Sequence, residues 1–398
     1  MKLYPNLIRP VVDALEEIFQ GKIFADKVIQ KTLKKDKRWG ARDRAFIAET
    51  TYNIVRWYRL LYEIRGAQPK SKSDWWEIIG IWFSINEVQL PDWKEFAKLD
   101  APSILQQHAK LSDRRIIKES IPDWLDEIGV EELGIKWPPT LSALNQQAPL
   151  VIRVNTLKTD RASLQKILAD KGIESTAHGK EALILTKRRN LFTLPEFKKG
   201  LFEIQDGSSQ EVANFLAVEP GMWVIDACAG AGGKTLHIGA QMKNKGKIFA
   251  LDIHEWKLRE LRKRATRAGI DNIENRPIVN QKVLKRLTER ADRLLLDVPC
   301  SGLGVLKRNP DAKWKIDVAF LNKVKNIQKH ILHTYPKMLK KGGQMVYATC
   351  SILPSENQQQ VQAFLEANEE FTLIKEQQLL PQDNGFDGFY MALIQKAE

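Results

Sequence analysis

Apolar residues recur along the first 140 residues at the three- and four-residue spacing of amphipathic helices. The stretches "LIRPVVDALEEIFQG" (residues 7–21) and "RDRAFIAETTYNIVRWYRLLYEI" (residues 42–64) both show this spacing. Gly21 closes the first stretch, as glycine often does at the end of a helix. Eight of the eleven tryptophans also lie before residue 140, where we expect them to fill a core. The pattern predicts an all-α domain over residues 1–140.

Residues 141–211 have the mixed pattern of a small α/β unit. Residues 160–173 show helical spacing, whereas three shorter stretches have the apolar runs and alternation of strands. The predicted strands are "PLVIRVNTLK" (149–158), "EALILT" (181–186) and "GLFEIQD" (200–206).

From residue 212 onward, short apolar strands alternate with helix-like segments such as "EWKLRELRKRATRAG" (residues 255–269). This alternation predicts a doubly wound α/β domain over residues 212–398, with a mostly parallel sheet and helices on both faces. The predicted strands are "MWVIDA" (222–227), "KIFALDI" (247–253), "RPIVN" (276–280), "RLLLDV" (293–298) and "QMVYAT" (344–349).

The charge balance favours a polyanionic partner. The chain has 62 Lys and Arg residues against 49 Asp and Glu residues, which gives a net charge of +13. Nucleic acid is the commonest partner of so basic a protein. The alternative is an ordinary soluble enzyme that happens to be basic.

The sequence predicts a cytoplasmic protein that does not span a membrane. The longest apolar stretch, "WWEIIGIWFSI" (residues 75–85), is shorter than a membrane helix and contains Glu77. The first ten residues lack the apolar core of a secretory signal. Three cysteines in 398 residues do not form a disulfide framework, so we expect reduced thiols.

A glycine-rich turn follows the first predicted strand of the last domain, in "VIDACAGAGGKTLHIGA" (residues 224–240). Glycines allow a ligand to approach the backbone, and the start of the following helix offers free N–H groups. A phosphate-binding Walker loop requires glycine at position 228, which is cysteine. The dinucleotide pattern fits Gly230 and Gly232 but fails at Thr235. The turn therefore indicates a nucleotide-like ligand without identifying it.

Asp252 ends the next predicted strand, 22 residues after Gly230. A carboxylate at this place can accept hydrogen bonds from both ribose hydroxyls of a bound nucleoside. Because the pyrophosphate fingerprint is incomplete, S-adenosylmethionine fits better than NAD. An NAD-linked oxidoreductase and a simple strand-end role for Asp252 stay as alternatives.

The three cysteines all follow predicted strands of one domain. In "LLLDVPCSGLGVLKRNPDAKW" (residues 294–314), Asp297 ends a strand and Cys300 lies in the loop after it. Cys350 ends the next strand, and Cys228 lies beside the glycine-rich turn, so all four side chains should meet at one edge of the sheet. The spacings of 72 and 50 residues between the cysteines are not those of zinc ligands, and we expect no metal.

Two thiols and one carboxylate are the protein groups that a methyl donor needs beside it to methylate carbon 5 of cytosine. This carbon becomes nucleophilic when a thiolate adds to carbon 6, and thiolates are both strong nucleophiles and good leaving groups. A second group must then remove the proton from carbon 5. Asp297 is suited to bind the Watson–Crick edge of the base and to favour protonation of nitrogen 3.

Four ordered motifs resemble those of the Sun/Nop (RsmB-like) family of RNA cytosine-5 methyltransferases. They are "DACAGAGGKT", "ALDIHEWKL", "LLLDVPCSGLGVLKRNPD" and "YATCSILPSEN", with "LFEIQDGSSQ" before them and "GFDGFYMALIQK" after them. The resemblance implies a Rossmann-like class I methyltransferase domain over residues 212–398. It also implies a small RNA-binding subdomain over residues 141–211, through "RVN" (153–155), and a NusB-like helical domain over residues 1–140.

The same resemblance implies roles for individual residues. Cys350 would be the nucleophile, and Cys300 would assist proton removal and product release. The residues implied to contact S-adenosylmethionine or the target base are Cys228, Ala229, Gly230, Ala231, Gly232, Gly233, Lys234, Asp252, Asn280 and Asp297. The basic residues after the second cysteine motif, Lys307, Arg308, Lys313 and Lys315, are candidates for RNA contact.

Two positions depart from the family pattern. The family loop usually reads Ala-Pro-Gly-Gly, where this chain has Gly230-Ala231-Gly232-Gly233. Asn280 stands where the family often has an Asp that contacts the adenosine. The loop keeps its close-approach glycines, and Asn can still form hydrogen bonds.

The predicted function is transfer of a methyl group from S-adenosylmethionine to carbon 5 of a cytidine in RNA. Ribosomal RNA is the first choice of substrate and tRNA the second, and we expect a monomer. A non-catalytic RNA-binding factor for ribosome assembly stays as an alternative from another class.

Overall fold

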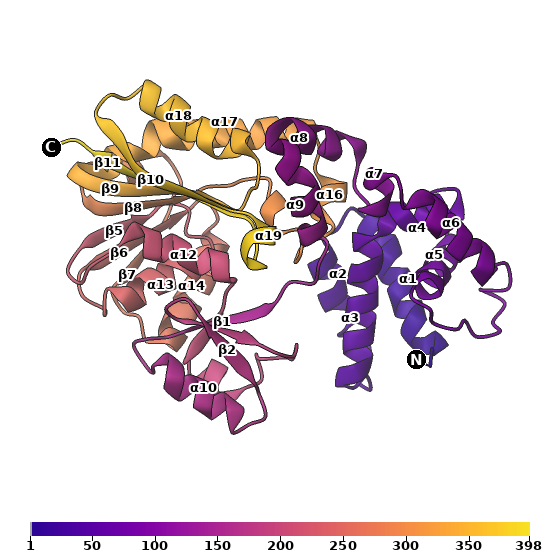
Figure 1. Ribbon diagram of the computed structural model, residues 1–398. Helices are drawn as coiled ribbons and strands as arrows, with labels where there is room; N and C mark the ends of the chain where they lie inside the picture. Colours follow the sequence, from indigo (N-terminus) through magenta and orange to yellow (C-terminus); the bar gives the residue numbers. More distant parts are fainter. Residues whose placement is uncertain (1) are drawn as a thin grey trace. The chain divides into compact units, whose positions relative to one another are not determined.

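The computed structural model describes residues 2–398, which fold as two compact units (Figure 1). The helical unit contains residues 2–146 and the later segment 306–318. The sheet unit contains residues 147–305 and 319–398. The chain therefore passes from one unit to the other three times.

The helical unit is built from amphipathic helices around one apolar core, which confirms the all-α prediction for the N-terminal region. Ile8, Leu15 and Trp75 are completely buried in this core. Pro138 and Pro139, next to the predicted domain end at residue 140, lie at the start of α9. The helices of the unit are α1 (Pro5–Phe19), α2 (Ala25–Thr32), α3 (Ala41–Arg56), α4 (Tyr58–Arg65), α5 (Lys72–Ile85), α6 (Ala101–Leu111), α7 (Arg115–Lys118), α8 (Asp123–Leu133), η1 (Gly134–Lys136), α9 (Trp137–Leu144) and α16 (Ala312–Lys315).

The segment 306–318 is an integral part of the helical unit. The Trp314 indole N–H donates to the Val55 carbonyl at 2.7 Å, and Asp311 accepts the backbone N–H of Ala25 at 2.8 Å. Lys313 is 1% exposed and donates to the Asn145 side chain at 3.3 Å. Burial lowers the pKa of Lys313 well below its usual value.

These contacts correct the prediction that Lys307, Lys313 and Lys315 bind RNA. Lys307 and Lys313 are buried. Lys315 donates to the Ile23 carbonyl and pairs with Asp311, both at about 2.6 Å or less. Their charge suggested a surface role, but they stabilise the fold of the segment instead.

The sheet unit contains a seven-stranded, mostly parallel sheet in the described part of the chain, as predicted. Its order is β10-β11-β9-β8-β5-β6-β7. Strand β11 pairs antiparallel with both of its neighbours, β9 and β10. The strands are β5 (Trp223–Asp226), β6 (Lys247–Asp252), β7 (Ile273–Pro277), β8 (Ala291–Asp297), β9 (Leu339–Thr349), β10 (Phe371–Leu379) and β11 (Phe389–Lys396).

One predicted strand is displaced. The apolar run at 276–280 suggested a strand there, but β7 covers Ile273–Pro277 and pairs with β6 up to Pro277 opposite Asp252. Val279 lies outside the sheet and is 74% exposed. Because β7 is an edge strand with half-buried polar residues, its apolar pattern is weak.

Helices cover both faces of the large sheet (Figure 1). Leu294 and Leu296 of β8 face a core that α17 (Val318–Thr334) and α18 (Gln358–Glu366) complete. Leu295, between them, faces the opposite core with α12 (Gly207–Leu216) and α13 (Gly233–Gln241). Alternate side chains of one strand are thus buried on opposite faces, as in doubly wound folds.

A second sheet of four antiparallel strands lies in the same unit, within the described residues, in the order β2-β3-β1-β4. Helix α10 (Arg161–Ala169) packs Leu164 and Leu168 against its core. The strands are β1 (Leu150–Val154), β2 (Ser175–His178), β3 (Ala182–Leu185) and β4 (Phe202–Ile204).

The "RVN" residues join this small sheet to the part of the unit that contains the large sheet. Buried Arg153 donates to the Gly233 carbonyl at 2.7 Å, and Asn155 donates to the Ala268 carbonyl at 2.8 Å. Glu203 of β4 is 6% exposed and pairs with Arg264 at 2.9 Å and with Arg267. These side chains hold the two sheets together and are not free to contact RNA.

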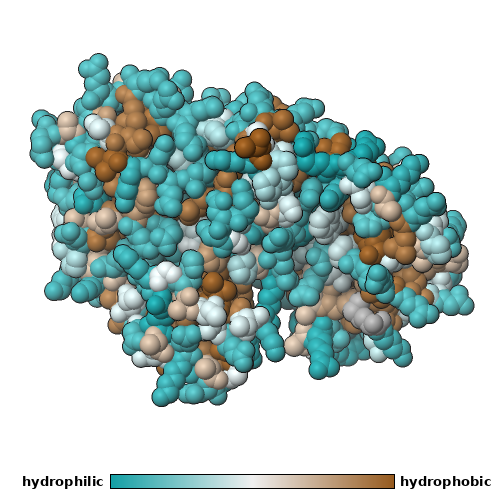
Figure 2. Space-filling model, in the orientation of Figure 1, coloured by the Kyte–Doolittle hydropathy of each residue, from teal (hydrophilic) through white to brown (hydrophobic). Residues whose placement is uncertain are grey.

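The exposed face in Figure 2 is largely hydrophilic, with small scattered groups of hydrophobic residues. Of the helices in residues 2–398, none combines the length and the apolar character that are needed to cross a bilayer.

We expect Glu203→Gln to lower the free energy of unfolding by about 2–3 kcal/mol, because the change leaves two partly buried arginines without their anion. Urea denaturation followed by tryptophan fluorescence measures the effect. The control is Glu255→Gln, whose pair with Arg259 is about two-thirds exposed and contributes little. Equal effects of the two substitutions would contradict the structural role of Glu203.

Candidate active site

Four neighbouring strands end at one edge of the large sheet and carry the predicted site residues there. Asp226, Asp252 and Asp297 are the last residues of β5, β6 and β8, and Cys350 follows β9 directly. The strand order reverses between β5 and β8, and doubly wound sheets bind their ligands at such a reversal. The structure therefore brings together the residues that the sequence placed on one edge.

The glycine-rich loop connects β5 to α13 and is fixed to β6. The Gly230 N–H donates to the Asp252 carboxylate at 2.9 Å. Gly232 has a φ of +88°, and a Cβ there would lie 2.5 Å from the Leu261 side chain. A Cβ at Gly230 would meet no atom within 4 Å. One glycine thus allows close packing of the loop, and the other borders open space.

Lys234 links this loop to β8. Its ammonium donates to the Asp297 carboxylate at 2.7 Å and lies 5.2 Å from the centre of the Phe389 ring. Burial by itself would lower the pKa of Lys234, but the charge and the hydrogen bond of Asp297, together with weaker electrostatic contributions, outweigh burial and raise this pKa. The ion pair spans the point where the strand order reverses.

Asp226 is a completely buried carboxyl at the end of β5, and the sequence did not identify it as special. The Thr235 hydroxyl donates to its Oδ2 at 2.7 Å, whereas Oδ1 has no partner among the described residues. Burial raises the pKa of Asp226 to about 7, although the Thr235 hydrogen bond opposes the rise.

Cys300 and Cys350 lie side by side, with their Sγ atoms 3.3 Å apart. The hydrogen bond to Cys350 and burial together raise the pKa of the Cys300 thiol well above its usual value. Cys300 is therefore a protonated thiol at neutral pH. Both side chains remain partly exposed, which leaves them accessible from the edge of the sheet.

Two of the predicted cofactor residues have other contacts. Burial and the charge of Asp226 raise the pKa of the Cys228 thiol, which stays protonated. Asn280 is exposed and caps α15 (Gln281–Lys285), because its side chain accepts the Lys282 N–H at 2.9 Å.

The residue that sequence reasoning missed most clearly is Glu356. The "YATCSILPSEN" motif contains Glu356 without assigning it a role, but Glu356 is completely buried and accepts hydrogen bonds from Ser301 and Ser351. A serine directly after each of two cysteines was the available signal.

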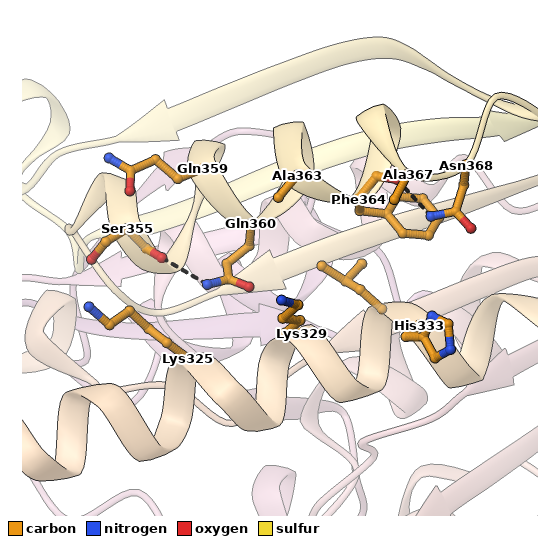
Figure 3. Close-up of a pocket in the computed structure, with 11 residues that line it drawn as sticks. Lys325, Lys329, His333, Ser355, Gln359, Gln360, Ala363, Phe364, Ala367 and Asn368 are labelled. Carbon is orange, nitrogen blue, oxygen red and sulfur yellow. Dashed lines mark hydrogen bonds between the residues drawn. The ribbon is translucent and has the colours of Figure 1, made fainter.

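A groove of about 360 Å³ lies between α17 and α18 (Figure 3). Lys325, Lys329 and His333 line one side, and Gln360, which donates to the Ser355 carbonyl at 3.1 Å, lines the other. None of the described residues that line the groove belongs to the predicted site, and we assign no ligand to it. Among residues 2–398, no group of three or more His, Cys, Asp or Glu side chains is arranged to hold a metal ion.

Two family profiles match the chain. A profile described as 16S rRNA methyltransferase RsmB/F matches residues 213–395. A second, described as the ferredoxin-like domain of RsmF/B-like methyltransferases, matches residues 121–191. These matches confirm the family that the sequence motifs indicated.

Individual proteins agree with the profiles. A probable ribosomal RNA small subunit methyltransferase B of Synechocystis is 36% identical over 299 residues, which is 70% of this chain and 67% of that protein. The chain spans about two thirds of the length of the curated relatives that it matches. A crystal structure of PH0851 has a TM-score of 0.84 over 100% of both chains at 23% identity, which shows a common fold. A methyltransferase homologue of Pyrococcus horikoshii has a TM-score of 0.64 at 28% identity, over 72% of this chain and 99% of that one.

We expect Asp226→Asn to change how stability depends on pH. A carboxyl whose pKa is higher in the folded state makes the wild-type protein lose stability as pH rises from about 4 to about 7. The Asn variant lacks this loss, so its stability relative to wild type should increase over that range, by at most about 4 kcal/mol, and then stay constant. Thermal unfolding at a series of pH values measures the difference.

The control for this experiment is Asp292→Asn. Burial would raise the pKa of Asp292, but its hydrogen bonds from Lys340 and the Trp223 N–H, together with nearby positive charges, outweigh burial and lower this pKa. The contribution of Asp292 to stability should therefore not change between pH 5 and 8. A pH-independent difference for Asp226→Asn would show that its carboxyl does not titrate near neutrality.

Proposed function

This chain belongs to the RsmB/F family of methyltransferases, and we propose that it methylates carbon 5 of a cytidine in RNA through a covalent bond between Cys350 and carbon 6. S-adenosylmethionine is the methyl donor of the family. The observation that carries the proposal is the 3.3 Å separation of the Cys300 and Cys350 sulfurs at the edge of the sheet. A methyl transfer that needs no covalent adduct would not require two adjacent thiols.

The residues at the loop fit S-adenosylmethionine. The open space beside Gly230 allows close approach to the backbone, and Asp252 supplies a carboxylate for ribose hydroxyls at the next strand end. The bound cofactor supplies a methyl group on positively charged sulfur, which makes the methyl carbon electrophilic. The nearby carboxylates of Asp252 and Asp297 are suited to a cationic ligand.

We propose that Cys350 attacks the base. Its thiol proton passes to solvent, and the electron pair of the resulting thiolate forms the bond to carbon 6 of cytosine. The electrons of the 5,6 double bond move into the ring, which is held protonated at nitrogen 3, and carbon 5 becomes nucleophilic. Asp297, which is 27% exposed, would accept a hydrogen bond from the Watson–Crick edge and favour this protonation.

We propose that Cys300 completes the reaction. Its hydrogen bond to Cys350 is the largest cause of its raised pKa. When the Cys350 sulfur bonds to carbon 6, this hydrogen bond is lost, so the pKa of Cys300 should fall and its thiol can lose a proton to solvent. That thiolate takes the proton from carbon 5, the 5,6 double bond forms again, and the bond from carbon 6 to Cys350 breaks.

Ribosomal RNA is the substrate that we propose. The relatives of this chain carry names that specify the RNA of the small ribosomal subunit, and a net charge of +13 favours a polyanion. Such a substrate also agrees with the cytoplasmic location that the sequence predicts. Transfer RNA remains the second substrate to test with the same chemistry.

We expect Cys300→Ala to accumulate a covalent protein–RNA adduct, because its adduct cannot be released. Cys350→Ala should form none. The measurement is a denaturing gel of both variants after expression in cells, with ribonuclease treatment to identify the slow-migrating band. Sequencing of the trapped RNA distinguishes rRNA from tRNA.

The double variant Cys300→Ala/Cys350→Ala is the matched control and should give no adduct. If the Cys350→Ala variant forms an adduct and the Cys300→Ala variant does not, the two roles are exchanged. Cys300, the cysteine of the Pro-Cys motif, would then be the nucleophile. If neither variant traps RNA and wild-type protein transfers no methyl group to small-subunit RNA or tRNA, a non-catalytic RNA-binding role replaces the proposal.

A further inference from the structure

Glu356 is a buried carboxylate that the proposed steps do not use. It ends the short helix η4 (Pro354–Glu356) and has no exposed surface. The Tyr347 hydroxyl of β9 donates to its backbone oxygen at 2.7 Å. This contact fixes the backbone of Glu356 against the strand that leads to Cys350.

Both carboxylate oxygens of Glu356 accept hydrogen bonds from the loops that carry the two reactive cysteines. Ser301, directly after Cys300, donates its N–H to Oε1 at 2.8 Å and its hydroxyl to Oε2 at 2.5 Å. Ser351, directly after Cys350, donates its hydroxyl to the same Oε2. One carboxylate therefore joins two loops that are 50 residues apart in the chain.

The two loops have matching geometry around this carboxylate. Each serine oxygen also accepts the N–H two residues further on, from Leu303 at 3.3 Å and from Leu353 at 3.2 Å. The Ser301 and Ser351 Oγ atoms lie 3.3 Å apart, the same separation as the sulfurs of the preceding cysteines. The spacing of the serines and the spacing of the sulfurs are thus set together.

The hydrogen bonds to Glu356 replace the water that burial removes. Its partners are uncharged donors: the two serine hydroxyls, the Ser301 N–H and the side-chain amide of Gln328, which donates at 3.0 Å. Gln328 also donates to the Pro299 carbonyl at 3.0 Å, which ties the residue before Cys300 to the same cluster. Hydrogen bonds to a charged acceptor are stronger than neutral ones, so the cluster resists displacement of either loop.

We propose that Glu356 is a positioning residue that holds the Cys300 and Cys350 loops side by side, so that one thiol can attack carbon 6 while the other reaches the proton on carbon 5. The inference rests on the proposed function, because the sulfur separation matters only if both thiols act on one base. Carbons 5 and 6 are bonded neighbours, so a small shift of either loop would prevent one of the two steps.

The test uses Glu356→Gln, which keeps the size of the side chain but places an amide donor where two hydroxyls and an N–H donate. We expect kcat for methyl transfer to fall about 100-fold, the order of loss that a misplacement of about 1 Å causes, with KM for RNA nearly unchanged. The control is Glu369→Gln, which replaces an exposed carboxylate and should leave both constants unchanged.

A second measurement does not depend on methyl transfer. Diamide oxidises two adjacent thiols to a disulfide and is itself reduced, and mass spectrometry of peptides locates the bond. Wild-type protein and Glu369→Gln should form the Cys300–Cys350 disulfide rapidly, because the sulfurs start 3.3 Å apart. Glu356→Gln should form it about 10-fold more slowly, since disulfide formation requires close and specific geometry.

If Glu356→Gln fails to fold, the double variant Ser301→Ala/Ser351→Ala carries the test, because it removes only two hydroxyls. It should slow both disulfide formation and turnover. Wild-type rates of disulfide formation and turnover in these variants would overturn the inference.

The two proposals fail in different ways. Slow disulfide formation in Glu356→Gln together with no methyl transfer by wild-type protein would support the positioning role and overturn the proposed function. Normal turnover by Glu356→Gln, in an assay where wild-type protein methylates RNA, would overturn the positioning role and leave the function intact.

Discussion

The parallel pairing of β8 with β9 is the interaction on which the candidate site depends. Its register places Asp297 opposite Ala348, so both strands end at the same level. The Val298 N–H donates to the Ala348 carbonyl at 3.0 Å and continues this pairing beyond β8. A shift by one residue would turn every side chain of a strand to the other face, and two buried faces prevent such a shift. The meeting of Cys300 with Cys350 follows from this register.

The buried strands were the part of the fold that sequence could predict. β5, β6, β8 and the end of β9 are short apolar runs, because both of their faces are covered by helices. β11 was recognised only as part of a closing motif, β10 was not predicted, and β7 was placed three residues too late. Edge strands keep one side towards solvent or polar neighbours, so their residues lack the continuous apolar run that identifies a central strand.

The candidate site was predictable where residue type and strand position agree. A cysteine or aspartate at the end of an apolar run indicates chemistry, and Cys300, Cys350 and Asp297 were found this way. Glu356 was assigned no role and Lys313 was assigned to RNA contact, whereas both are buried, which is rare for charged side chains. Their burial depends on segments far away in the sequence, and no local pattern records such contacts.

The ion pair of Lys234 and Asp297 and the hydrogen bonds of Glu356 have different relations to a substrate. The first lies across the reversal of strand order, where a ligand can exchange with it. The hydrogen bonds of Glu356 involve the serines that follow the two cysteines, and Glu356 itself is completely buried. A ligand can therefore replace the partner of Lys234 or Asp297, whereas it cannot reach the hydrogen bonds of Glu356. Binding of substrate and alignment of the thiols thus depend on different polar groups.

The segment 306–318 has a consequence for the order in which the protein can form during synthesis. The helical unit is translated first, but its core includes Trp314, whose indole hydrogen bond to Val55 joins residues more than 250 positions apart. The ribosome must therefore complete much of the sheet unit before the helical unit has all of its parts. Folding of nascent multidomain chains usually proceeds from the N-terminus, one domain after another. Here the nascent N-terminal helices lack part of their packing until a segment from within the sequence of the sheet unit has been made.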